Sequence, residues 1–105
     1  MADIMKLMQQ AQEMQGRLQQ IQEELAQRTV TGTAGGGMVT VEADGKGAVR
    51  QVRIDPSVVR ADDVAMLEDL ITVALRDVQA KARALEEAEM GKAAGGMNLP
   101  FQLPF

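Results

Sequence analysis

The sequence predicts an α+β domain of the order α-β-β-β-α, in which a three-stranded antiparallel meander lies between two long helices. Apolar residues recur every three or four positions over residues 3–27 and 63–90, whereas the stretch between them alternates with period two. Helices of this length would extend ~37 to 42 Å, but such short strands would span only ~17 to 20 Å. We therefore expect both helices to project beyond the sheet and to bury their apolar stripes against another helix or a second chain, as in a homodimer.

The first predicted helix carries an unbroken heptad seam over about three repeats. The seam consists of Ile4, Leu7, Ala11, Met14, Leu18, Ile21 and Leu25. This pattern is typical of a coiled coil and predicts packing along the whole length against another helix. Gly16 lies outside the seam, where it lowers helix stability by about 1 kcal/mol relative to Ala.

Period-two alternation predicts three strands, near residues 29–31, 38–43 and 48–54. Residues 32–37 and 44–47 supply the turns, and the second turn is a strong hairpin signal because Asp44-Gly45 tolerates positive φ. Asp55-Pro56 ends the third strand, since Pro cannot donate to a strand ladder. Short turns between consecutive strands predict an antiparallel meander.

Asp62 or Asp63 is expected to cap the second helix, and Gly91 is expected to end it. Its apolar stripe is Val64, Leu67, Leu70, Ile71, Ala74, Val78, Ala82 and Leu85. Residues 1–91 would then form the folded domain and residues 92–105 a flexible C-terminal tail. Because three antiparallel strands separate the helices, we expect these to lie antiparallel side by side, with Met1 and the Gly91 region near the arm tip.

The side chains of most enzyme active sites are scarce here. The chain has no His, Cys or Tyr, and Ser57 follows Pro56 in a turn without a base motif around it. We expect no catalytic, metal or cofactor site, no small-molecule substrate and no enzymatic activity. The first residues lack the positive flank and apolar run of a signal peptide, and no long apolar stretch follows, so we expect a cytoplasmic protein without a membrane partner.

The charge pattern bears on nucleic acids in two opposing ways. The net charge of −4 argues against nucleic acid on bulk electrostatics. Local charge can outweigh net charge, however, because a phosphate responds to basic residues within about a Debye length, ~8 to 10 Å. Both aromatic residues, Phe101 and Phe105, are in the tail, so no stacking platform for unpaired bases is expected and single-stranded nucleic acid is disfavoured.

Several segments, taken in order, resemble the YbaB/EbfC nucleoid-associated protein family over nearly the whole chain. They are the Gln- and Met-rich opening helix, Val30-Thr31-Gly32, Gly36-Gly37 before Val39 and Val41, the Gly45 turn, residues 52–56, residues 66–71 with Ala74, and the tail residues 96–100 and 104–105. The resemblance implies a homodimer whose paired helices project like tweezer arms. It also implies a bacterial, nucleoid-associated protein that binds double-stranded DNA with modest sequence preference. Family DNA contacts are attributed to the helical arms, which here puts forward Lys6, Arg17, Arg76, Lys81 and Arg83.

A second interpretation remains open: a coiled-coil-armed protein adaptor or holdase without DNA binding. Met1, Met5, Met8 and Met14 would place adaptable apolar side chains near the arm tip. Alternatively, these side chains only fill the space between the paired helices. Exposure of the Met side chains in the dimer would distinguish the two readings.

Overall fold

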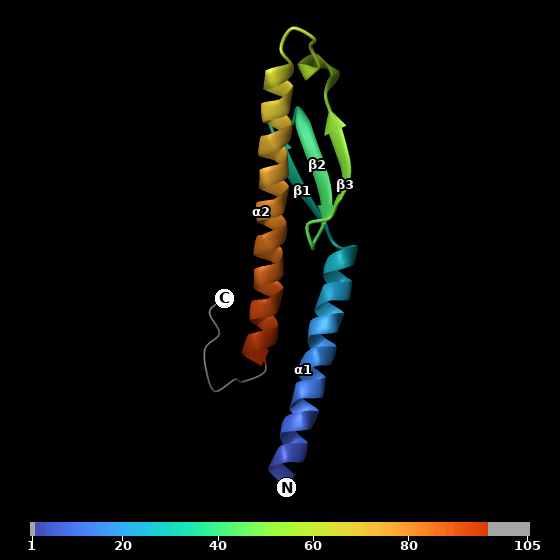
Figure 1. The fold of residues 1–105 in the computed structure, drawn as a ribbon, viewed down its shortest axis with the longest axis vertical. Coiled ribbons are helices and arrows are strands. Elements are labelled where there is room, and N and C mark those ends of the chain that lie inside the picture. The colour runs from blue at the N-terminus through green and yellow to red at the C-terminus, as the bar shows by residue number, and fades with distance from the viewer. Residues whose placement is uncertain (1, 97–105) are drawn as a thin grey trace.

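The computed structural model describes residues 2–96, which form an elongated α-β-β-β-α fold (Figure 1). The elements are α1 (Ala2–Gln27), β1 (Thr29–Ala34), β2 (Val39–Asp44), β3 (Val49–Ile54), the short 3-10 helix η1 (Pro56–Val58) and α2 (Val64–Gly96). The molecule measures 73 × 23 × 16 Å. The predicted order of helices and strands is confirmed, and the elongated shape fits projecting helices.

The three strands form an antiparallel meander of order β1-β2-β3, and α2 packs on β1 and β2. The α2-facing side chains of β2, Val39, Val41 and Ala43, are fully buried. From α2, Ala74 and Val78 complete this small aliphatic core. Every residue of β3 is exposed, because α2 does not extend over this edge of the sheet.

Strand β1 is longer than predicted, because Gly32 belongs to the strand and not to a turn. A Cβ atom at Gly32 would lie 2.4 Å from the backbone nitrogen of Val78 and 2.5 Å from the carbonyl oxygen of Ala74. The glycine therefore permits the close approach of α2 to the sheet. Residues 35–37, all glycines with positive φ, make the turn to β2.

The β2–β3 hairpin turn is held by the carboxylate of Asp44, which accepts hydrogen bonds from the backbone of Lys46 (2.8 Å) and Ala48 (3.0 Å). The bond from Ala48 is the main cause that lowers the pKa of Asp44 below its usual value. Positive φ occurs at Gly47 and not at Gly45. Gly45 is instead pressed against the end of α1, where its N–H donates to the carbonyl of Leu25 (2.8 Å).

Asp63 caps α2, as one of the two predicted residues, and its carboxylate accepts from the backbone N–H of Met66 at 3.2 Å. The predicted end at Gly91 is wrong, since α2 continues to Gly96. A single Gly costs a helix only about 1 kcal/mol, and the good helix formers Lys92 and Ala93 follow. Residues 92–96, assigned to the tail from the sequence, are thus helical; residues 97–105 lie outside the described part, and their flexibility stays a prediction.

The two helices run antiparallel, but α1 extends far beyond α2 (Figure 1). The first part of α2 lies beside the sheet, whereas α1 leads away from the end of the sheet. Arg17, in the middle of α1, consequently lines the same cavity as Lys92, so the expectation that Gly91 lies near the arm tip is wrong.

Burial along the predicted seam of α1 follows from this offset. Leu25 is 1% exposed and Leu18 is half-buried, but Leu7 is 63% exposed. Within one protomer, only the end of the seam nearest the sheet is covered.

Candidate nucleic-acid interface

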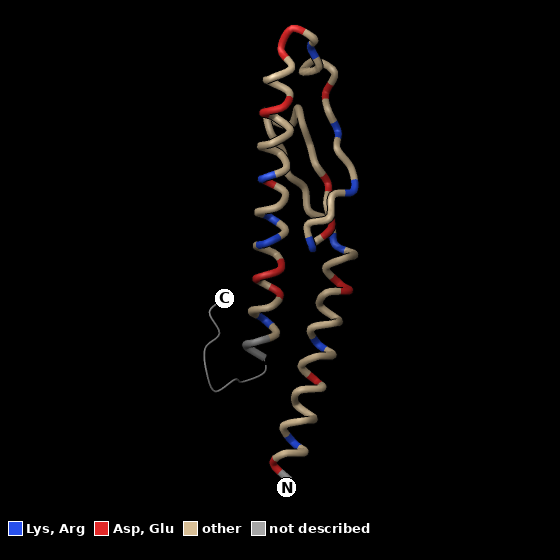
Figure 2. The backbone as a smooth tube through the Cα atoms, in the orientation of Figure 1, with Lys and Arg blue, Asp and Glu red and all other residues tan. Residues whose placement is uncertain are grey.

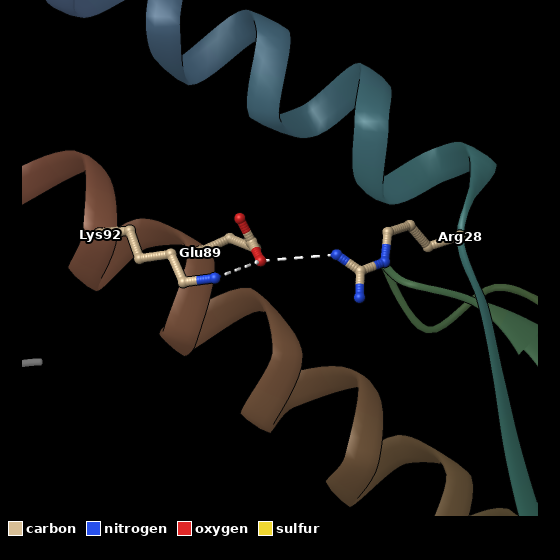
Figure 3. A network of polar contacts seen from close by, with 3 residues as sticks. All are labelled: Arg28, Glu89 and Lys92. Carbon is tan, nitrogen blue, oxygen red and sulfur yellow. Dashed lines mark hydrogen bonds and ion pairs between the residues drawn. The ribbon is translucent and has the colours of Figure 1, made fainter.

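Within residues 2–96, four basic residues form ion pairs: Arg28, Arg60, Lys81 and Lys92. Glu89 of α2 lies between Arg28 (3.5 Å) and Lys92 (3.4 Å), and thereby links α2 to the junction of α1 and β1 (Figure 3). Arg60 pairs with Asp62 at 3.0 Å near the start of α2. Such exposed pairs contribute about 0 to 1 kcal/mol each. Their main consequence here is that these cations already have an acidic partner.

Lys81, one of the five residues put forward from the sequence, is engaged at the edge of the sheet. Its ammonium group lies 3.1 Å from the carboxylate of Asp77 and donates to the carbonyl of Thr31, also at 3.1 Å. The carboxylate of Asp77 in turn accepts from the backbone N–H of Thr33 at 2.9 Å, which is the main reason for its lowered pKa; Lys81 lowers it further. Both side chains thus satisfy backbone groups of β1, and Lys81 is the least available of the five for a ligand.

The other four proposed contacts, Lys6, Arg17, Arg76 and Arg83, are exposed and form no ion pair within residues 2–96. The structure does not bring them into one patch. Figure 2 shows basic residues along both helices, with acidic residues between them. Arg17 lines a cavity of about 300 Å³ between α1 and α2, together with Glu24 and the paired residues Glu89 and Lys92.

Three further exposed cations have no ion pair in the described part of the chain, Lys46 in the hairpin turn and Arg50 and Arg53 on β3. Of these, Arg50 donates to the carbonyl of Ala26 and the hydroxyl of Thr29. Lys46 and Arg83 line one cavity of about 330 Å³, although they are far apart in sequence. The sequence did not predict that these two residues lie close together, because no local pattern indicates which turn of α2 packs beside the hairpin. Gly47 marks the turn, because its positive φ favours glycine, but it does not indicate which turn of α2 lies beside it.

The end of the molecule at the start of α2 is apolar and acidic instead of basic. A cavity of about 520 Å³ near the start of α2 is lined mainly by apolar groups such as Met66, Leu70 and Val73. Its charged residues are Asp63 and Asp69, which would repel a phosphate. The charge distribution therefore favours phosphate contact at the arms and the hairpin turn over this end.

Within residues 2–96, no group of three or more acidic, His or Cys side chains is arranged to hold a metal ion. Neither described helix combines the length and apolar character needed to span a membrane.

Comparisons with known proteins match almost the entire chain. A nucleoid-associated protein of Gemmatimonas aurantiaca is 48% identical over 103 residues, covering 98% of this chain and 99% of that protein. One from Xanthomonas axonopodis pv. citri is 52% identical over 105 residues, with 98% and 97% covered. The crystal structure of an uncharacterized protein from Helicobacter pylori superposes with a TM-score of 0.70 at 26% identity, covering 88% of this chain and 94% of the other.

The YbaB/EbfC DNA-binding family matches residues 1–97, which include every element of the fold. The resemblance seen in the glycine, valine and proline segments is thereby confirmed. This chain belongs to the YbaB/EbfC DNA-binding family.

Proposed function

We propose that this protein is a nucleoid-associated homodimer that binds double-stranded DNA with weak sequence preference through basic residues of its helical arms. Membership of a DNA-binding family is the observation that carries the proposal, and the relatives named nucleoid-associated proteins support the location. The proposal includes neither catalysis nor a cofactor.

The exposed cations support backbone contact. Lys6 and Arg17 on α1, with Arg76 and Arg83 on α2, have no ion pair in residues 2–96. Lys and Arg neutralise phosphates and release counterions, which gives salt-sensitive affinity that depends little on sequence. Two protomers would double the number of such contacts.

The difference between the two edges of the sheet supports a dimer that forms through the β3 edge. The β1 edge is occupied by Asp77 and Lys81. The β3 edge carries exposed apolar side chains, and we call Met38, Val49, Val52, Ile54 and Val59 the β3 surface. An exposed apolar edge strand is a template for pairing with another chain, so a second copy would cover the β3 surface.

One observation supports the alternative function as a protein adaptor or holdase. Met5 is 73% exposed and Met8 61% exposed in the protomer, so the tip of α1 offers apolar surface. Peroxide oxidation of the dimer, followed by mass spectrometry, distinguishes the readings. Rapid oxidation of Met5 and Met8, combined with no duplex binding, would favour the adaptor; slow oxidation would mean that the tip is covered.

Fluorescence anisotropy with a labelled duplex at low salt tests DNA binding directly. The parent should bind, and the double variant Arg17→Glu/Arg76→Glu should bind about tenfold or more weakly, because each charge reversal repels a backbone phosphate. Arg60→Glu is the control for a single charge reversal: it makes half of the double variant's change of charge, at a residue already paired with Asp62 near the start of α2. If Arg60→Glu loses as much duplex affinity as the double variant, the loss follows from the net charge of the protein and not from contacts of the arms. A parent that does not bind the duplex would contradict the proposal.

A further inference from the structure

A small polar cleft lies where the β2–β3 hairpin turn meets α2. It has a volume of about 330 Å³ and is lined by Lys46, Gly47, Gln79, Ala82, Arg83 and Glu86, which we call the hairpin notch. Figure 2 shows basic residues in the middle of α2 at the level of this turn. The notch joins cations that are separated by a strand and most of a helix in the sequence.

Ala82 lies at the floor of the notch and is 3% exposed. A Cβ atom at Gly47 would lie 4.0 Å from the Cβ of Ala82, an ordinary van der Waals contact. The turn therefore lies beside Ala82 of α2, with room for one more carbon atom between them. Side chains at positions 79, 83 and 86 share one face of the helix, so they flank Ala82.

The turn that presents Lys46 is held on both sides. Asp44 accepts from the backbone N–H groups of Lys46 and Ala48, and the N–H of Gly45 donates to the carbonyl of Leu25. Because the backbone of the turn is already fixed, less conformational entropy is lost in the turn when a ligand binds there. The fold thus determines the backbone position of Lys46, from which its exposed side chain extends.

The donors of the notch suit a phosphate group. Neither Lys46 nor Arg83 forms an ion pair with a carboxylate of the described chain, and Gln79 adds an amide that can donate. A guanidinium can bind two phosphate oxygens at once, and an ammonium adds a point charge. Glu86 is the one acidic group lining the notch, and it reduces the local charge to a single net positive.

We infer that the hairpin notch binds one phosphate group, with Lys46 and Arg83 as its cationic ligands and Gln79 as a neutral donor. In the DNA complex this group is a backbone phosphate, a statement that rests on the proposed function. The site extends the DNA-contacting surface from the helical arms to the sheet. Lys46, which sequence reasoning left out, becomes a DNA contact.

Duplex binding by neutral variants tests the shared phosphate. Lys46→Gln and Arg83→Gln should each weaken binding by about tenfold at low salt, the scale of one charge-assisted hydrogen bond. Because both cations hold the same phosphate, the double variant should lose less than the product of the two single losses. Its slope of log K against log salt should change no more than that of the more affected single variant.

Two further variants serve as controls for duplex binding: one should strengthen it, and the other should leave it nearly unchanged. Glu86→Gln should tighten binding, because it removes the carboxylate from the notch. Arg53→Gln removes an exposed cation without an ion pair, but one located on β3 outside the notch. If Arg53→Gln weakens binding as much as Lys46→Gln and Arg83→Gln, or if the two losses multiply fully, the notch is not the site.

A titration with inorganic pyrophosphate, followed by NMR, examines the notch without DNA. The amide signals of residues 46 and 47 and the side-chain Nε–H signal of Arg83 should shift together in the parent. In the double variant, which lacks the Arg83 guanidinium, the amide signals of residues 46 and 47 should stay unchanged. A parent that binds no duplex but shows these shifts would remove the proposed function and retain the phosphate site. Unshifted signals at these three positions would overturn the inference.

Discussion

Asp77 shows how a single side chain can close one edge of a sheet. Its carboxylate accepts from the backbone of Thr33 and pairs with Lys81, which donates to the carbonyl of Thr31. Polar groups of an edge strand would otherwise be open to pairing with another chain. The same two contacts explain why Lys81, a cation on an exposed arm, is already engaged.

Acid should destabilise the protein through such carboxylates. The pKa values of Asp44, Asp55 and Asp77 are all lowered from 3.8 in the folded protein, in each case chiefly by a hydrogen bond from a nearby group. A lowered folded pKa means that the stabilisation is present above the unfolded value and is lost as pH falls through the folded one. Melting temperature should therefore fall as the pH is lowered below about 4. Asp77→Asn should make this fall shallower; an equally steep fall would contradict the role of Asp77.

Replacing glycines at two positions should change stability in opposite directions. Gly32→Ala would force a Cβ atom to within 2.4 Å of the α2 backbone and should destabilise the fold by several kcal/mol, as overpacking does. Gly16→Ala, with nothing within 4 Å, should stabilise α1 by up to about 1 kcal/mol. Urea denaturation of both variants measures this difference. A tolerated Gly32→Ala would mean that α2 does not pack closely on β1.

At the scale of elements, periodicity and caps predicted the type and order of the two α-helices and the three strands, but not the short 3-10 helix η1. Asp63 caps α2 and Asp55-Pro56 ends β3, because these effects act over a few neighbouring residues. The predictions that Gly32 belongs to a turn and that Gly91 ends a helix are wrong. Packing against α2 places Gly32 within β1, and strong helix formers next to Gly91 continue α2 past it. The meeting of Lys46 with Arg83 depends on tertiary register, which no local pattern contains.

The uneven burial of α1 predicts an uneven response to truncation. Leu25→Ala should cost about 2 to 5 kcal/mol in unfolding free energy, because Leu25 is 1% exposed against the hairpin. Leu7→Ala, at a side chain 63% exposed, should cost far less, within about 0.5 kcal/mol. Chemical denaturation provides both values. A cost at Leu7 equal to that at Leu25 would contradict the exposed tip.

The whole molecule is long and thin, and its open surfaces determine how it can assemble. One protomer measures 73 × 23 × 16 Å and leaves the β3 surface uncovered. A partner on that side would cover apolar side chains while leaving the cations of the arms and the hairpin notch free. Assembly and DNA contact would then use different parts of the molecule.

Light scattering of a β3 variant tests this assembly. The parent should have the mass of a dimer, whereas Val52→Glu should be a folded monomer, because it would bury a charge at the β3 surface. Gln51→Lys is the control on the same strand, since Gln51 lies opposite Glu42 and can form a favourable cross-strand pair. A parent of monomeric mass, or a dimeric Val52→Glu, would contradict the dimer proposed here.

We propose that this acidic protein contacts DNA through locally placed cations. The measurement that tests it most directly is the affinity for a duplex across a series of salt concentrations, repeated with an unrelated sequence. Each neutralised phosphate contributes about −0.9 to the slope of log K against log salt. We predict a slope of several units that is nearly the same for both sequences. A parent that fails to bind at low salt, or binding whose affinity does not change with salt, would contradict the account.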